Sequence, residues 1–280
     1  MSTEECLVQI CTSHSEFDGE WKWQAAGMSY LIQTKKNRFL VVDGGEDQED
    51  ALRLMKKMKE LSGDDRPTVA LWILTHPHLD HFGALLHLSD PQENPVQPKI
   101  EQLCYQLPDD PVLPRTGLRY DWEDSQIRLL TERIGAPLLV PHTGDELCID
   151  GIKLRFFFTP EDMLDQIKDV NELSLVFQIK GEHQSIMFTG DAYERTTRPT
   201  AFRFWDELKS DYCQLAHHGL NGGSAEFYAR VDAPNVLIPI SIAGDRDVAT
   251  WIPGTCARQF AERMAKTCRK AFEGDITIPL

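Results

Sequence analysis

The run VALWIL at residues 69–74 most restricts how this chain can fold. A continuous apolar segment of this length, with β-branched and aromatic residues, is typical of a strand that is buried on both faces. Helical patterns lie on both sides of it in the sequence, at residues 47–62 and 80–89. This order predicts a layered α/β fold in which the run is a central strand.

Other short apolar runs, separated by turns, predict further strands. They cover residues 7–11, 28–34, 38–45, 152–158, 172–179, 185–190, 211–216 and 235–241. Further helices are predicted at residues 123–134, 200–209, 224–231 and 254–270. Dense prolines at residues 90–116 break regular structure and indicate a loop-rich insertion. Because no repeat or low-complexity linker divides the chain, we interpret residues 1–280 as a single domain.

The net charge argues against one class of partner. The chain has 29 Lys and Arg residues against 44 Asp and Glu residues, which gives a formal net charge of −15. A general affinity for the backbone of DNA or RNA is therefore not expected, and a small anionic substrate fits the charge better than long nucleic acid.

The sequence also bears on location. No run approaches about 18 consecutive apolar residues, so no membrane span is expected. The first residues, MSTEECLVQICTSHSEF, lack the basic and apolar regions of a secretory signal, and the seven cysteines form no Cys-x-x-Cys pair. We therefore expect a cytoplasmic protein with reduced thiols. No heptad run indicates an oligomeric state.

The string HPHLDH places four metal-capable side chains directly after the central strand. Alternate residues of an extended segment share a face, so His76 and His78 can bind one ion. Asp80 and His81 fall at the start of the next helix and could hold a second ion. Imidazole and carboxylate ligands suit Zn²⁺, and the absence of thiolate leaves Mn²⁺ or Fe open.

Two more predicted strands end in residues of the same kind. Asp191 follows the strand at 185–190, and the pair His217 and His218 follows the strand at 211–216. Strand ends on one edge of a sheet can meet, so we expect these side chains to join the first cluster.

These residues resemble the motifs of the metallo-β-lactamase-fold hydrolases. VVDGG resembles the first motif, with Asp43, and THPHLDH resembles the second. FTGD resembles the fourth motif, with Asp191, and His218 before a glycine resembles the fifth. Within the superfamily the chain looks most similar to the branch with the hydrolase domain of competence DNA-uptake channels and the phosphorylcholine esterases. Asn171 followed by LSLV, then TGDA, and His-His-Gly carry that similarity.

The resemblance implies an αββα sandwich of two mixed β-sheets flanked by helices, with a dinuclear zinc site. It implies that His76 and His78 bind one zinc, Asp80 and His81 bind the other, and Asp191 bridges them. Either His217 or His218 completes the second site, and we favour His218. His217 would then face the substrate.

Two residues leave the implied site open to more than one interpretation. Where most members carry a third-motif histidine, this chain has Asn171, a weaker ligand or another kind of site residue. His142 or His183 could replace that histidine, although each lies in a turn beside a strand. Asp43 either orients the ligand histidines from behind or serves as a turn residue before two glycines.

The function implied is a metal-dependent hydrolase that uses a zinc-activated water on a small phosphodiester or related ester. Asp80 would orient or deprotonate that water, and His217 would hydrogen-bond a substrate oxygen. Arg195, Arg198 and Arg203 are candidates to bind a phosphate. Two alternatives remain: a carboxylic ester, thioester or lactone hydrolase, and a non-catalytic metal-binding protein with an incomplete site.

Overall fold

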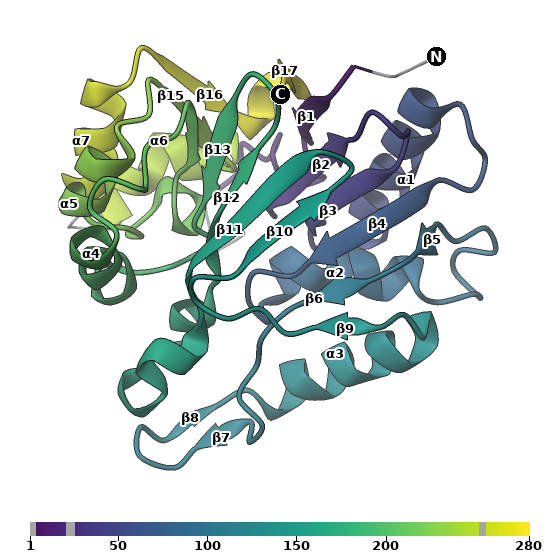
Figure 1. Ribbon diagram of the computed structural model, residues 1–280, viewed down its shortest axis with the longest axis horizontal. Coiled ribbons are helices and arrows are strands. Elements are labelled where there is room, and N and C mark those ends of the chain that lie inside the picture. Colours follow the sequence, from purple (N-terminus) through teal and green to yellow (C-terminus); the bar gives the residue numbers. More distant parts are fainter. Residues whose placement is uncertain (1–3, 21–25, 252–255) are drawn as a thin grey trace.

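The computed structural model describes residues 4–20, 26–251 and 256–280. Two mixed sheets pack face to face, and helices cover both outer faces (Figure 1). The expected αββα sandwich is therefore confirmed. Both sheets follow one plan, in which three antiparallel pairings are followed by three parallel ones along the strand order.

Each sheet combines strands from separate parts of the chain. In spatial order, the first sheet holds β17 (Ile276–Pro279), β1 (Cys6–Gln9), β2 (Ser29–Gln33), β3 (Phe39–Asp43), β4 (Thr68–Ile73), β6 (Leu103–Cys104) and β9 (Leu138–Leu139), with β5 (Lys99–Ile100) also paired to β4. In the same order, the second sheet holds β10 (Glu146–Ile149), β11 (Ile152–Phe158), β12 (Val176–Lys180), β13 (Ser185–Phe188), β14 (Tyr212–Gln214), β15 (Asn235–Ile238) and β16 (Thr267–Lys270). A separate hairpin joins β7 (Val112–Leu113) to β8 (Leu118–Arg119).

The helices divide between the two outer faces. The first sheet is covered by α1 (Gln48–Ser62), α2 (Leu79–Leu88) and α3 (Asp121–Ile134). The second is covered by α4 (Glu194–Arg203), α5 (Ala225–Val231), α6 (Ile242–Trp251) and α7 (Cys256–Met264), which gather at the left of Figure 1. Among the residues that the structure describes, none of these helices has both the length and the apolar character needed to cross a membrane.

The main core lies between the sheets. Because side chains alternate along a strand, Leu40 and Val42 of β3 point into this core while Val41 points to the helices. The ring of Tyr30 in the first sheet meets Phe188 of the second edge-on, with centroids 5.1 Å apart. The interface between the sheets is therefore closely packed and almost wholly apolar.

Several expected elements differ in the structure. Residues 172–179 were expected to form one strand, but β12 begins only at Val176. Residues 170–173 form a 3₁₀ turn instead, and the Asn171 backbone N–H in it donates to the side chain of Asp169. The helix expected at 254–270 ends at Met264, and the chain continues as β16. The helix expected at 200–209 starts earlier, at Glu194.

The proline-rich segment at 90–116 contains regular structure as well as loops. Within it, β5 and β6 pair in parallel with β4 and so extend the first sheet. Strands of two residues are too short to show an alternating pattern, which explains why the sequence did not indicate them.

An ion pair ties the turns of the two sheets together. Arg38 lies directly before β3, at the end of the β2–β3 turn. It donates two hydrogen bonds, of 2.9 and 2.7 Å, to the carboxylate of Asp150 in the β10–β11 turn. Thr34 donates a third, of 2.9 Å. The Asp150 side chain is only 1% exposed. This paired arrangement is among the stronger kinds of charged hydrogen bond.

We expect Asp150→Asn to lower the free energy of unfolding by about 1–2 kcal/mol at neutral pH. Asparagine tolerates the backbone φ of 54° at this position, so the turn itself should persist. Hydrogen bonds from Arg38 lower the pKa of Asp150 to about 2 in the folded protein. The stabilisation is therefore complete above about pH 4 and is lost as the pH falls through about 2. Urea denaturation should show the difference between wild type and variant shrinking over that range; a constant difference would contradict the assignment.

Candidate metal centre

The polar residues after three strands meet at one edge of the sandwich. His76 and His78 follow β4, Asp191 follows β13, and His218 lies in the 3₁₀ turn after β14. Residues Asp80 and His81 occupy the first turn of α2. The structure thus brings together side chains that are far apart in the sequence.

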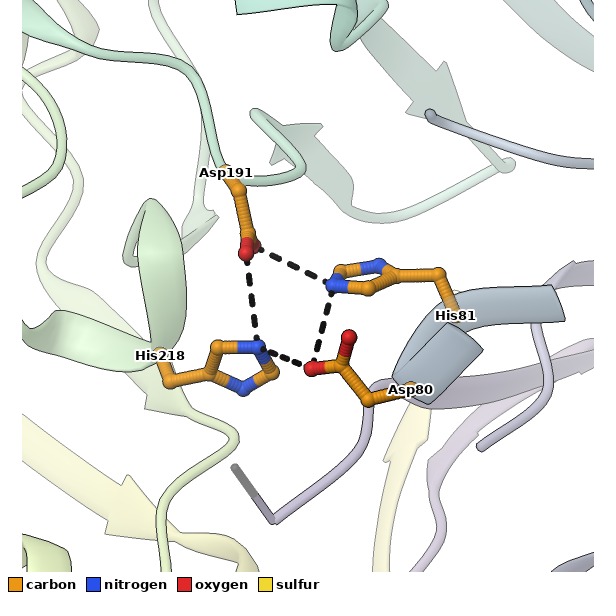
Figure 2. Close-up of side chains that lie close together, drawn as sticks. All are labelled: Asp80, His81, Asp191 and His218. Carbon is orange, nitrogen blue, oxygen red and sulfur yellow. Dashed lines mark ion pairs between the residues drawn. The ribbon is translucent and has the colours of Figure 1, made fainter. Parts of the chain in front are cut away.

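Four of these side chains form one group, shown in Figure 2: Asp80, His81, Asp191 and His218. The Nε2 atom of His81 lies 3.4 Å from Asp191 Oδ1 and 3.6 Å from Asp80 Oδ2. The Nε2 atom of His218 lies 3.0 Å from Asp80 Oδ2 and 3.5 Å from Asp191 Oδ2. Two imidazole nitrogens and two carboxylates therefore face a common point.

A second group shares one of these carboxylates. His76 Nε2 lies 3.0 Å from His78 Nδ1 and 3.8 Å from Asp191 Oδ2. His76, His78 and Asp191 have ligand atoms that all lie within 4.8 Å of one another. Asp191 belongs to both groups, so a carboxylate stands where it can bridge two ions.

In His81 and His218, a contact at Nδ1 determines which ring nitrogen faces the centre. Asp43 is fully buried, and its Oδ2 lies 2.8 Å from His81 Nδ1. The same carboxylate accepts hydrogen bonds from the Thr75 backbone N–H, at 2.8 Å, and from its hydroxyl, at 2.9 Å. His218 Nδ1 lies 2.7 Å from the carbonyl oxygen of Pro239. Both rings therefore direct Nε2 into the centre.

The helix that carries Asp80 and His81 is held close to the neighbouring loops. A Cβ atom at Gly83 would lie 1.9 Å from the carbonyl oxygen of Glu46, so only glycine permits this approach. The backbone N–H of Met28 donates a 3.0 Å hydrogen bond to the carbonyl of Asp80. The first turn of α2 is thereby fixed relative to the first sheet.

The charges in the centre are strongly coupled. Burial by itself lowers the pKa of His218, but Asp191 and Asp80 outweigh burial and raise the pKa to about 10. Burial opposes ionisation of Asp191, yet His81 and His218 hold the pKa of its carboxyl well below the usual value. Burial lowers the pKa of His76. The imidazoles and carboxylates of the centre therefore favour each other's charged forms, and a divalent ion would replace protons there, because metal ligands must be deprotonated.

Unpaired polar atoms show that the residues fit a metal ion. His81 Nε2, His218 Nε2 and Asp191 Oδ1 are buried. Ion-pair partners lie 3.0–3.6 Å from them, but in the described part of the protein none of these three atoms forms a hydrogen bond of acceptable geometry. Leaving buried polar atoms unpaired is costly, so such atoms call for a ligand. Imidazole and carboxylate donors of this kind suit Zn²⁺ and other transition metals.

The other predicted site residues lie around this centre. His217 is outside both groups: its Nε2 is 3.9 Å from Asp191 Oδ2, and its Nδ1 is 2.5 Å from Asn221 Oδ1. Asn171 is buried, and its Nδ2 donates a 2.8 Å hydrogen bond to the hydroxyl of Tyr193. Its Oδ1 is a further buried atom without a partner among the described residues.

The residues considered as substitutes or phosphate ligands lie elsewhere. His142 and His183 are exposed and belong to neither group. Arg195, Arg198 and Arg203 are also exposed, and each forms an ion pair with a carboxylate, at 3.3, 2.5 and 2.9 Å respectively. Their positive charges are therefore already engaged.

Sequence reasoning did not identify Thr75, Pro239, Tyr193 or Asn221. Pro239, directly after β15, carries no local sign of a role, because its contact comes from a distant part of the chain. Thr75, Tyr193 and Asn221 belong to a motif or lie within three residues of motif residues, and this proximity is the signal that could have indicated them.

The match to known proteins agrees with this geometry. Residues 24–159 match the family model described as the metallo-beta-lactamase superfamily. This match covers just under half of the chain's 280 residues. No curated protein sequence is significantly similar to the chain, so membership of the superfamily and of a branch within it stays a prediction.

Solved structures share the metallo-beta-lactamase fold at low sequence identity. YhfI from Bacillus subtilis, a metallo-beta-lactamase fold protein, is 15% identical over 98% of this chain and 100% of its own, with a TM-score of 0.59. CmlA from Streptomyces venezuelae, a diiron beta-hydroxylase, is 10% identical over 100% of this chain and 55% of its own, with a TM-score of 0.59. A diphosphatase from the PhnP family is 11% identical over 98% of each chain, with a TM-score of 0.51. These likenesses concern the fold alone.

We expect Asp43→Asn to lower the affinity of the centre for Zn²⁺ by about 10–100-fold. The amide has only one acceptor oxygen, so it cannot replace the carboxylate for both Thr75 and His81. Competition with a chelating dye measures the affinity. Asp150→Asn, a buried aspartate outside the centre, is the matched control and should bind Zn²⁺ like wild type. Unchanged affinity in Asp43→Asn would show that this carboxylate does not set the orientation of His81.

Proposed function

We propose that this protein is a metal-dependent hydrolase of a small phosphodiester or a related ester. The observation that carries the proposal is the pair of His and Asp groups joined through Asp191. Two positions for divalent ions on either side of one carboxylate are typical of sites that hydrolyse esters.

Two ions would be held by the residues that the geometry groups together. His76 and His78 would hold one, Asp80, His81 and His218 would hold the other, and Asp191 would bridge them. Zn²⁺ is the proposed metal, with Mn²⁺ or Fe as alternatives. When bound, such ions supply an activated water and stabilise the negative charge that develops on the substrate.

The protein's own groups would complete the chemistry. Asp80 is the most exposed of the grouped carboxylates, with 16% of its side chain accessible, so it is placed to orient or accept a proton from a water. His217 is 20% exposed at the side chain and lies beside the centre without belonging to either group. It is therefore free to contact the substrate, and Asn221 would hold its ring in place.

Charge supports a small anionic substrate. Two divalent ions would concentrate four positive charges at one edge of a protein whose net charge is −15. The arginines after Asp191 are paired with carboxylates, so they offer no cationic track for long nucleic acid. One structural neighbour is a diphosphatase, and this supports the proposal of a phosphorus-containing substrate. A cytoplasmic location stays a prediction.

The proposal predicts activity that depends on metal. The protein treated with chelator should be inactive toward bis(4-nitrophenyl) phosphate, and added Zn²⁺ or Mn²⁺ should restore turnover. His78→Ala should lower kcat/KM at least about 100-fold, because it removes a ligand of one ion. His78 is only half-buried, so the fold should survive the substitution. His183→Ala removes an exposed histidine and should leave turnover unchanged.

A substrate panel separates the alternatives. If the protein hydrolysed a thioester, a lactone or a carboxylic ester but not the phosphodiester, its substrate would be an acyl compound and not a phosphodiester. Elemental analysis showing less than about one metal per chain, with no turnover of any substrate, would favour a non-catalytic metal-binding protein. Full activity in His78→Ala would overturn the proposed site.

A further inference from the structure

Tyr193 is a phenol beside the candidate metal centre that the roles above leave unused. It lies two residues after Asp191, directly before α4, and is half-buried. Its ring packs edge-on against the ring of His217, with centroids 5.3 Å apart. The phenol therefore stands on the same side of the centre as the histidine proposed to face the substrate.

The side chain of Asn171 fixes the position of this hydroxyl. Asn171 is 5% exposed, and its Nδ2 donates to the Tyr193 oxygen at 2.8 Å. Its segment runs along the centre, because the Ser174 hydroxyl accepts a 2.9 Å hydrogen bond from the Asp191 backbone N–H. Because the Asn171 amide N–H donates to the phenol oxygen, Asn171 Oδ1 remains an acceptor without a partner among the described residues.

The hydrogen of the phenol is then available to another acceptor. A hydroxyl can accept and donate at the same time, and Asn171 Nδ2 uses one of its lone pairs. In residues 4–20, 26–251 and 256–280, no side chain or carbonyl accepts a hydrogen bond from Tyr193. A half-buried donor without an acceptor, held rigidly beside a cation site, is suited to an anionic ligand.

We propose that the Tyr193 hydroxyl donates a hydrogen bond to an oxygen of the bound anion and that Asn171 is the positioning residue that aims it. The inference rests on the proposed function for the identity of that anion, a phosphate ester. A donor that is already in place when the substrate arrives stabilises developing negative charge without reorganisation. It also gives the amide at position 171 a role other than weak metal ligation.

Tyr193→Phe removes only the hydroxyl and tests the inference. With excess Zn²⁺ and inorganic phosphate as the probe, calorimetry should show about tenfold weaker phosphate binding in this variant. The kcat/KM for bis(4-nitrophenyl) phosphate should fall about 10–100-fold. Metal content by elemental analysis should stay at the wild-type value. Tyr212→Phe, in a half-buried tyrosine of β14 outside the centre, is the matched control and should change none of these quantities.

A double-mutant cycle tests the positioning role of Asn171. At saturating Zn²⁺, Asn171→Ala should weaken phosphate binding, and adding Tyr193→Phe should weaken it little further, since both changes remove one contact. A merely structural role would not produce this coupling. Losses that simply add would overturn the positioning role.

The outcomes distinguish this inference from the proposed function. Equal phosphate affinity and equal kcat/KM in wild type and Tyr193→Phe would overturn the inference and leave the proposed function standing. Loss of metal from Tyr193→Phe would also overturn it, because the phenol would then support the metal-binding residues. If wild type hydrolysed no phosphodiester, the proposed function would fail, and phosphate affinity alone would decide the role of Tyr193.

Discussion

The apolar interface between the two sheets is the constraint on which the rest of the structure depends. Tyr30 and Leu71 of the first sheet and Phe156 and Phe188 of the second are buried within it. Because the sheets share one plan of pairing, packing them face to face brings the carboxyl ends of β4, β13 and β14 to a single edge. Burial of this apolar surface is the main stabilising contribution, and it offsets the cost of a polar cluster at that edge.

The polar cluster is costly to fold. Asp43, His217 and His218 all have positive φ, at 58°, 52° and 55°. Each such residue costs about 1–3 kcal/mol and persists only where its surroundings hold it. These surroundings are specific: Asp43 is held by Thr75 and His81, and His218 by a backbone carbonyl. The cost is consistent with a site whose geometry is set before a ligand binds.

Most strands and several helices could be predicted from the sequence because their hydrophobic periodicity is local; β11 was predicted with its observed bounds. The edge strands β16 and β17 were missed, because half of their residues are exposed or polar and only pairing with a neighbour makes them strands. The start of β12 was misplaced for a similar reason. Leu173 and Leu175 alternate with polar residues as in a strand, but a cap from Asp169 favours a turn at residues 170–173.

The sequence by itself determined which side chains can bind a metal, since residue type and position at a strand end are local properties. It identified the histidines and aspartates of the centre but could not decide between His217 and His218. Only the tertiary structure decided that His218 joins the group with Asp80 and that Asp191 belongs to both groups. It alone brought Tyr193 to Asn171 and His217. Contacts of this kind depend on how two sheets and their loops pack, and no single segment of the sequence contains that information.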